Sequence, residues 1–183
     1  RSGLLSEGRQ WLGRSISTGS LGPSTQVLVE GLRISWGVAE FVAQEEMKRH
    51  TGYWWSPTSE RLVVARVDES TVDVIPRFGI HADSVSVTEQ RYPRAGRPNA
   101  LVSLWLLDLQ SGTRTAIDLG PDTDIYVANV HWSQDGHSAY VERQNRTQTQ
   151  LDVLTVAADG STGVLLTEQA ETWINLSNDF TAL

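Results

Sequence analysis

The chain has 183 residues, of which 39% are hydrophobic and 20% charged, which is the usage of a soluble globular protein with enough apolar residues for a core. Its formal net charge of −7 argues against a nucleic-acid partner, because phosphate binding needs a clustered basic face. Cysteine is absent, which excludes disulfides and thiolate metal sites, and no apolar run is long enough for a membrane helix, so we expect no membrane partner.

The first 26 residues are rich in Gly and Ser. We predict that residues 1–26 form a flexible N-terminal segment and that residues 27–183 form the folded part. The segment lacks the basic and then apolar pattern of a signal peptide. Because the chain begins at Arg1 and not at Met, we expect a fragment or a processed product. The composition leaves the localisation open, and we expect a periplasmic or cytoplasmic parent protein.

The first strong pattern along the chain is helical and covers residues 38–50. Every residue after Val42 is a fair to good helix former, and Phe41 and Val42 begin an apolar side. On a helix, Glu45 and Glu46 lie about 100° apart, so both carboxylates can reach one cation. On a strand they would point to opposite faces. The helix therefore decides whether the two carboxylates can act together.

A solvated helix face also explains these two carboxylates. Glu45 with Arg49, and Glu46 with His50, would form i,i+4 pairs that stabilise a helix by about 0.2–0.5 kcal/mol each. A Glu-Glu dipeptide is by itself a weak signal. The residue pattern alone therefore favours a solvent-exposed acidic helix over a binding site.

The remainder of the chain is typical of short antiparallel strands. Apolar runs flank polar or Gly-containing turns, which predicts four hairpins. Their strands cover residues 62–67 with 71–75, 101–109 with 114–119, 126–132 with 139–143, and 151–156 with 163–167. We predict an all-β fold with one short helix that carries Glu45 and Glu46.

An internal repeat connects these hairpins. Residues 55–62 align with residues 132–139, and a fainter third copy covers residues 176–183. One propeller blade takes about 40 to 50 residues, so the longer interval between the first two copies indicates an insertion. We predict a partial β-propeller of about three to four antiparallel blades. Two unrelated hairpins that share a Trp-Ser turn are the alternative.

No further set of residues assembles a site for chemistry. The chain has no Gly-x-Ser-x-Gly elbow, its four histidines lack zinc-binding spacing, and no Gly-rich phosphate loop follows a strand. Asp122 and Asp124 lack the rest of a calcium loop. We expect no catalytic residue, no metal and no cofactor in this chain.

Four ordered segments carry a family resemblance. They are GVAEFVAQEEM at residues 37–47 with TGYWWSP at residues 51–57, RYPRAGRPN at residues 91–99, QNRTQ at residues 144–148, and WIN at residues 173–175. Together they resemble the N-terminal propeller of the dipeptidyl peptidase IV family, with the bacterial members or the cytosolic animal branch most similar. The similarity runs from about Ile34 to the C-terminus.

The resemblance implies a function. In that family the propeller covers an α/β-hydrolase domain that holds the Ser, Asp and His of a serine exopeptidase, which releases N-terminal dipeptides. A Glu-Glu pair of the propeller binds the free α-ammonium of the peptide, and the resemblance places that pair at Glu45 and Glu46, with Gln44 and Tyr53 supporting the loop. The hydrolase domain is absent from this sequence, as is the Arg that family members use beside the Glu pair. The chain alone would therefore be inert.

The implied partners are a peptide with a free N-terminal amine and the hydrolase domain of the same protein. An incomplete propeller also exposes sheet faces and edges, so a homo-oligomer is a further expectation. Two alternatives stay open. One is a non-enzymatic propeller that binds proteins, in which Glu45 and Glu46 are an exposed acidic helix. The other is the propeller of a related oligopeptidase without an amine clamp.

Overall fold

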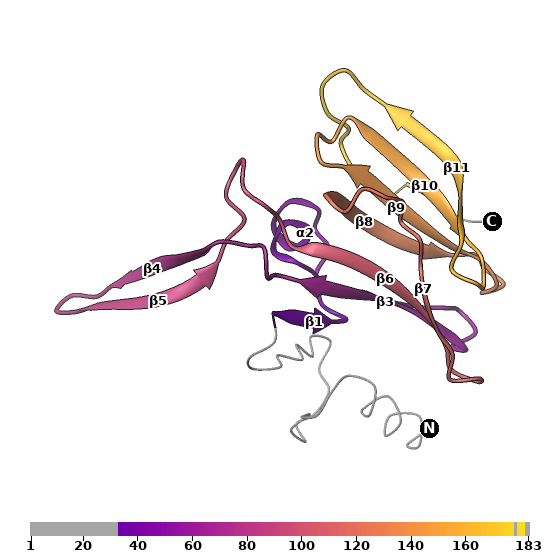
Figure 1. Cartoon of the computed structure of the whole chain (residues 1–183), viewed down its shortest axis with the longest axis horizontal. Coiled ribbons are helices and arrows are strands. Elements are labelled where there is room, and N and C mark those ends of the chain that lie inside the picture. Colours follow the sequence, from indigo (N-terminus) through magenta and orange to yellow (C-terminus); the bar gives the residue numbers. More distant parts are fainter. Residues whose placement is uncertain (1–32, 178, 182–183) are drawn as a thin grey trace.

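The computed structural model describes residues 33–177 and 179–181, which fold into two antiparallel sheets and a projecting hairpin (Figure 1). The predicted N-terminal segment, residues 1–26, lies outside the described residues. The all-β prediction is confirmed, and α2 (Phe41–Glu46) is the helix among the described elements. In the described part of the chain, no helix has the length and apolar character needed to cross a membrane.

The first sheet contains five strands, with β3 (Arg61–Asp68) at its centre. One edge of β3 pairs along its whole length with β6 (Leu101–Asp108), which in turn pairs with β7 (Arg114–Ala116). The other edge pairs with both β1 (Ile34–Trp36) and β2 (Tyr53–Trp55). The segment that carries α2 therefore interrupts what would otherwise be a single edge strand.

The second sheet is a four-stranded meander of consecutive strands. Its strands are β8 (Ile125–Trp132), β9 (Ala139–Asn145), β10 (Gln150–Val156) and β11 (Thr162–Gln169). A meander of this size is one propeller blade, so the prediction of a partial propeller is confirmed. We predicted about three to four blades, whereas the described residues form two blade-sized sheets and the hairpin.

Three of the predicted hairpins are confirmed, as β6 with β7, β8 with β9, and β10 with β11. The first is wrong, because residues 62–67 pair with β6 and not with residues 71–75. The Ser70 N–H donates to Asp68 Oδ1 (3.0 Å), so the chain does turn there. The turn leads outward into an arm made of β4 (Val74–Ile80) and β5 (Val85–Arg91). This arm is the insertion that the repeat spacing indicated (Figure 1).

The internal repeat is also visible as two matching turns. In each turn a serine N–H donates to a carbonyl five residues later, from Ser56 to Arg61 O (2.9 Å) and from Ser133 to Ser138 O (2.9 Å). The same serine hydroxyls accept from the N–H groups of Arg61 (3.1 Å) and Ser138 (3.0 Å). The third copy begins no strand among the described residues. Part of it crosses the second sheet, where the Phe180 ring lies 5.0 Å from that of His131.

The hydrophobic core lies between the two sheets. Alternate residues of β3 and β6 are buried, as the period of two along a strand requires, and Val64 of β3 is buried as well. The alternate residues meet side chains of β8, β9 and β10, with two from the chain after β7. The core residues are Val63, Ala65, Val67, Val102, Leu104, Leu106, Ile117, Leu119, Ile125, Val127, Val130, Ala139, Val141, Leu154 and Val156. Burial of this set holds the two sheets, and the residues at their junction, in a fixed relation.

Candidate functional site

The helix that carries the two predicted site residues is short. We predicted a helix over residues 38–50, and the structure limits it to Phe41–Glu46. The backbone N–H groups of Met47 (3.2 Å) and Arg49 (3.0 Å) both donate to the Ala43 carbonyl, and Lys48 has a positive φ of 56°. A left-handed residue with such bonds closes a helix at its C-terminus. Glu45 and Glu46 therefore occupy the last turn of α2.

Both predicted carboxylates are exposed. Within the described residues, the side-chain carboxylates of Glu45 and Glu46 have no hydrogen-bond or ion-pair partner, and the last turn of α2 holds no basic residue. The negative end of the helix dipole disfavours carboxylates there. The two charges also repel each other, so the end of α2 is an uncompensated negative site that a cation would stabilise.

Arg49 does not pair with Glu45, so that sequence prediction is wrong. Its guanidinium turns back and donates to Glu40 Oε2 at 2.7 Å, and both side chains are only 5% exposed. The same group donates to the carbonyls of Thr51 (2.9 Å) and Val127 (3.2 Å). It also lies 5.6 Å from the Trp54 ring centroid, within cation–π range. Sequence reasoning missed this cluster, because a spacing of nine residues across a helix end has no recognised pattern.

Trp54 and Trp132 join β2 to the second sheet. The Trp54 indole N–H donates to Asn129 Oδ1 (3.0 Å), and the Trp132 indole N–H donates to the Trp54 carbonyl (3.1 Å). Val127 and Asn129 lie on either side of a register shift in β8. A bulge redirects the groups beside it away from the regular ladder. It thus supplies the acceptors for both Arg49 and Trp54.

Two of the segments that carry the family resemblance, residues 37–47 and residues 91–99, pack together at α2. The Phe41 ring meets the Tyr92 ring edge-on, with centroids 5.0 Å apart. The Gln44 amide donates to the Ala39 carbonyl at 2.6 Å, so this side chain contacts the backbone just before the helix. Tyr53 lies half exposed on β2. Figure 1 shows α2 beside β8, which agrees with the contacts between them.

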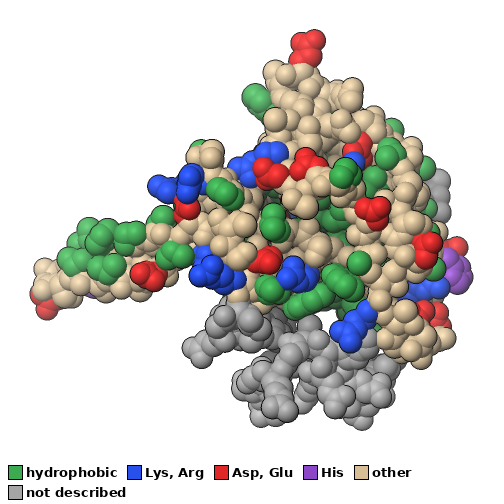
Figure 2. All heavy atoms as spheres, in the orientation of Figure 1, with side chains coloured by type: hydrophobic (Ala, Val, Ile, Leu, Met, Phe, Trp, Pro, Cys, Tyr) green, Lys and Arg blue, Asp and Glu red, His purple; other side chains and the backbone are tan. Residues whose placement is uncertain are grey.

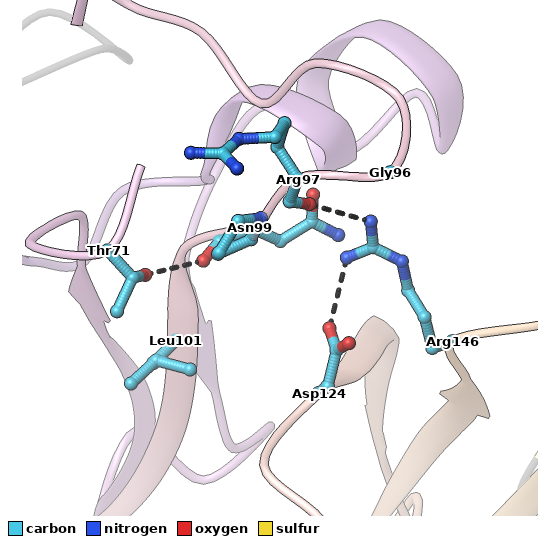
Figure 3. Close-up of a pocket in the computed structure, with 8 residues that line it drawn as sticks. Thr71, Gly96, Arg97, Asn99, Leu101, Asp124 and Arg146 are labelled. Atoms are coloured by element: carbon cyan, nitrogen blue, oxygen red, sulfur yellow. Dashed lines mark hydrogen bonds and ion pairs between the residues drawn. The ribbon is translucent and has the colours of Figure 1, made fainter. Parts of the chain in front are cut away.

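A cavity of about 500 Å³ lies near the base of the arm. Figure 3 shows Arg146 reaching across it to Asp124 and to the Arg97 carbonyl, both at 3.0 Å. Arg97 also binds Asp73, as does Arg94, and these two guanidiniums hold the pKa of the Asp73 carboxyl well below its usual range. The charged groups around this cavity are therefore satisfied by one another, unlike the carboxylates of α2.

Gly52 allows the close approach that closes the loop around α2. A Cβ at this position would lie 2.2 Å from the Val38 carbonyl oxygen, which is backbone and cannot yield cheaply. We expect Gly52→Ala to lower the free energy of unfolding by about 1–3 kcal/mol through overpacking, measured by denaturant titration. Gly163→Ala is the control, because its Cβ would meet only the Thr155 hydroxyl at 3.2 Å. If Gly52→Ala lowers the free energy of unfolding no more than Gly163→Ala does, the fold does not require the close approach at Gly52.

The part of the chain that the structure describes holds no group of three or more His, Asp or Glu that could bind a metal ion. Hard cations that prefer oxygen take six or more ligands, of which two carboxylates would supply only a part and water the rest. An organic ammonium is different, because it offers three hydrogen-bond donors and one charge. Two neighbouring exposed carboxylates can accept charge-assisted hydrogen bonds from such a group.

Comparisons with known proteins agree with the resemblance. The family model described as "Dipeptidyl peptidase IV (DPP IV) N-terminal region" matches residues 16–183. The chain is 31% identical over 153 residues to inactive dipeptidyl peptidase 10 of Rattus norvegicus, covering 78% of this chain and 19% of that protein. It is 30% identical over 144 residues to dipeptidyl peptidase 8 of Mus musculus, covering 67% of this chain and 16% of that protein.

Solved structures give the same result. A Bacteroides ovatus protein assigned as a dipeptidyl aminopeptidase IV matches with a TM-score of 0.69 and 29% identity, over 80% of this chain and 21% of that one. Porphyromonas gingivalis dipeptidyl peptidase 4 matches in fold with a TM-score of 0.71 and 23% identity, over 81% of this chain and 22% of that one. The chain thus spans about a fifth of the length of these relatives, and it belongs to the dipeptidyl peptidase IV N-terminal region family.

Proposed function

We propose that this chain is the part of a serine exopeptidase propeller that binds the free N-terminus of a peptide substrate. Glu45 and Glu46 accept hydrogen bonds from the substrate α-ammonium, and the hydrolase domain of the same protein cleaves after the second residue. One observation carries the proposal. Both carboxylates are exposed, without partners in the described residues, and placed at the negative end of a helix that packs against β8.

The chemistry of the proposal follows from charge and distance. An ammonium offers three donors, and a charge-assisted hydrogen bond to a carboxylate contributes about 1.5–3 kcal/mol. Fixing the substrate amine at a set distance from a nucleophile also fixes which peptide bond reaches it. Binding of the amine by Glu45 and Glu46 would therefore determine that cleavage follows the second residue of the peptide.

Blocking the substrate amine tests this function. We expect the full-length protein to cleave a free-amine peptide much faster than its N-acetylated form, because acetylation removes the positive charge and two of the three donors. The measurement is kcat/KM for the two peptides under the same conditions. Equal values would contradict the proposal.

A non-enzymatic interaction module is the second candidate. The observation that favours it is the similarity, at 31% identity, to a relative whose name describes it as inactive. The two candidates differ in the sequence that follows this chain in the gene. A Gly-x-Ser-x-Gly elbow within a few hundred residues supports the peptidase, and its absence supports the interaction module.

The apolar face of the arm supports a second copy of the protein as a partner. Phe78 pairs with Val87, and Ile80 with Val85, so these four side chains share one face. They are 58–83% exposed, and Figure 2 shows hydrophobic side chains gathered on the arm. The other face carries polar residues such as Arg77 and Thr88. A two-stranded hairpin is marginally stable alone, and a second copy of the same face would cover it.

We expect Phe78→Ser with Ile80→Ser to lower the mass of the full-length protein in solution from dimer to monomer, because the change removes the two larger of the four apolar side chains on the face that the two copies would share. Multi-angle light scattering at several concentrations measures this. The control is Val164→Ser, at another exposed apolar side chain, on β11. A wild-type protein that is monomeric at all concentrations would refute this partner, as would a dimer unaffected by the arm variant.

A further inference from the structure

The short helix α2 lacks the local interactions that hold most helices in place. It has six residues, its N-cap residue Glu40 makes no side-chain cap bond, and its last turn holds no basic residue. Helices shorter than about 12 residues are marginal in water even with good sequences. The position of Glu45 and Glu46 must therefore depend on contacts made by neighbouring residues with the rest of the fold.

Arg49 supplies the most connected of those contacts. Its guanidinium binds the residue before the helix (Glu40, 2.7 Å), the residue that leads into β2 (Thr51 carbonyl, 2.9 Å) and the second sheet (Val127 carbonyl, 3.2 Å). One side chain thus ties both ends of the α2 segment to the neighbouring blade. Other contacts of the segment are Phe41 on Tyr92, Gln44 on Ala39 and the packing of α2 itself against β8. Among the hydrogen bonds of the described residues, however, only that of Arg49 with Val127 joins the α2 segment to the second sheet.

The acceptor on the second sheet is specific to this fold. Val127 lies where the pairing of β8 with β9 shifts, and its carbonyl accepts from the guanidinium. Burial adds rigidity, since both members of the Glu40–Arg49 pair are 5% exposed. A charge-assisted bond that excludes water has one preferred geometry. The planar fork of arginine can serve three acceptors at once, which a lysine ammonium on a flexible stem cannot match.

We propose that Glu40 and Arg49 form a positioning pair, which holds the Glu45 and Glu46 carboxylates at a fixed place relative to the second sheet. The inference rests on the proposed function. In the proposed complex, neither Glu40 nor Arg49 touches the substrate. The pair acts through α2, and its loss lets the carboxylates move away from the substrate ammonium without removing them.

The test compares the affinity of the full-length protein for a dipeptide amide with that for the same compound lacking the α-amino group, by calorimetry. The ratio is the dissociation constant of the compound without the amine divided by that of the dipeptide amide, so a larger ratio means stronger anchoring of the amine. This ratio does not depend on the fraction of protein that is folded. We expect Glu40→Gln with Arg49→Met to reduce the ratio about tenfold, since misplacement by about 1 Å can cost roughly 100-fold. Arg49→Lys, which keeps the charge but not the fork, should give an intermediate ratio.

Two controls separate positioning from general stability. Arg143→Met breaks another ion pair of low exposure, with Asp152 at 2.6 Å in the second sheet, and should leave the ratio unchanged. Glu45→Gln with Glu46→Gln should bring the ratio close to one. A wild-type ratio in both the Glu40–Arg49 double variant and Arg49→Lys would overturn the positioning role while the proposed function stands. An unchanged ratio in the Glu45–Glu46 variant would instead overturn the proposed function.

Discussion

Replacing Glu45 or Glu46 with Gln in the full-length protein is expected to lower kcat/KM for a free-amine peptide, at a cost in transition-state binding of about 2–5 kcal/mol. This is the usual cost of removing one partner of a buried, hydrogen-bonded charge pair, such as the bound ammonium would form with these carboxylates. This corresponds to a loss of roughly 30-fold to several thousandfold. The Gln side chain keeps the shape and one carbonyl acceptor but removes the charge. Both carboxylates are exposed, so the substitutions should leave the free energy of unfolding within about 0.5 kcal/mol.

Glu168→Gln is the matched control, because Glu168 is an exposed carboxylate on β11 of the second sheet. It should leave kcat/KM unchanged. Loss of activity in all three variants would point to a general effect of net charge. Wild-type kcat/KM in Glu45→Gln and Glu46→Gln would refute the assignment of these residues.

Replacing Arg49 with Met is expected to have the second large effect, on stability. The change leaves Glu40 charged and 5% exposed, and breaking a buried pair by removing one partner costs about 3–5 kcal/mol. Adding Glu40→Gln should recover much of this loss, because the isolated charge is then gone. Denaturant titration measures the free energy of unfolding of both variants.

The partly exposed pair of Arg66 with Asp68 is the control for this experiment. These side chains are 30% and 19% exposed and lie 3.5 Å apart, so Arg66→Met should cost less than about 1 kcal/mol. If Glu40→Gln with Arg49→Met has the same free energy of unfolding as Arg49→Met alone, the isolated charge of Glu40 is not the cause of the loss of stability.

The sequence predicted those parts of the fold that depend on local chemistry. The Trp-Ser turns at Ser56 and Ser133 repeat because a serine hydroxyl and its own backbone close the same turn in both places. The hairpins of β8 with β9 and β10 with β11 follow from apolar runs around short polar turns. In each case the partner of a residue lies no more than 20 residues away along the chain, as for Ile125 with Asn145.

The parts of the structure that the sequence did not predict depend on residues that lie far apart along the chain. The turn at Asp68 looks like a hairpin turn, but the partner of β3 is β6, which lies beyond the arm. Arg49 looks like the end of a helix, but its acceptors include Val127, which is 78 residues away. Long-range pairing and the burial of a charged side chain depend on the assembled sheets, and no local pattern encodes them. The two candidate carboxylates were found by resemblance, since their dipeptide alone favoured a solvated helix.

One measurement tests the central claim most directly. It determines kcat/KM for the wild-type full-length protein and for Glu45→Gln with Glu46→Gln, each with a free-amine peptide and with the same peptide lacking the α-amino group. If the carboxylates bind the ammonium, the substitutions lower kcat/KM only when the amine is present, with a coupling of about 2 kcal/mol or more. An equal loss on both peptides, or no loss on either, would contradict the claim.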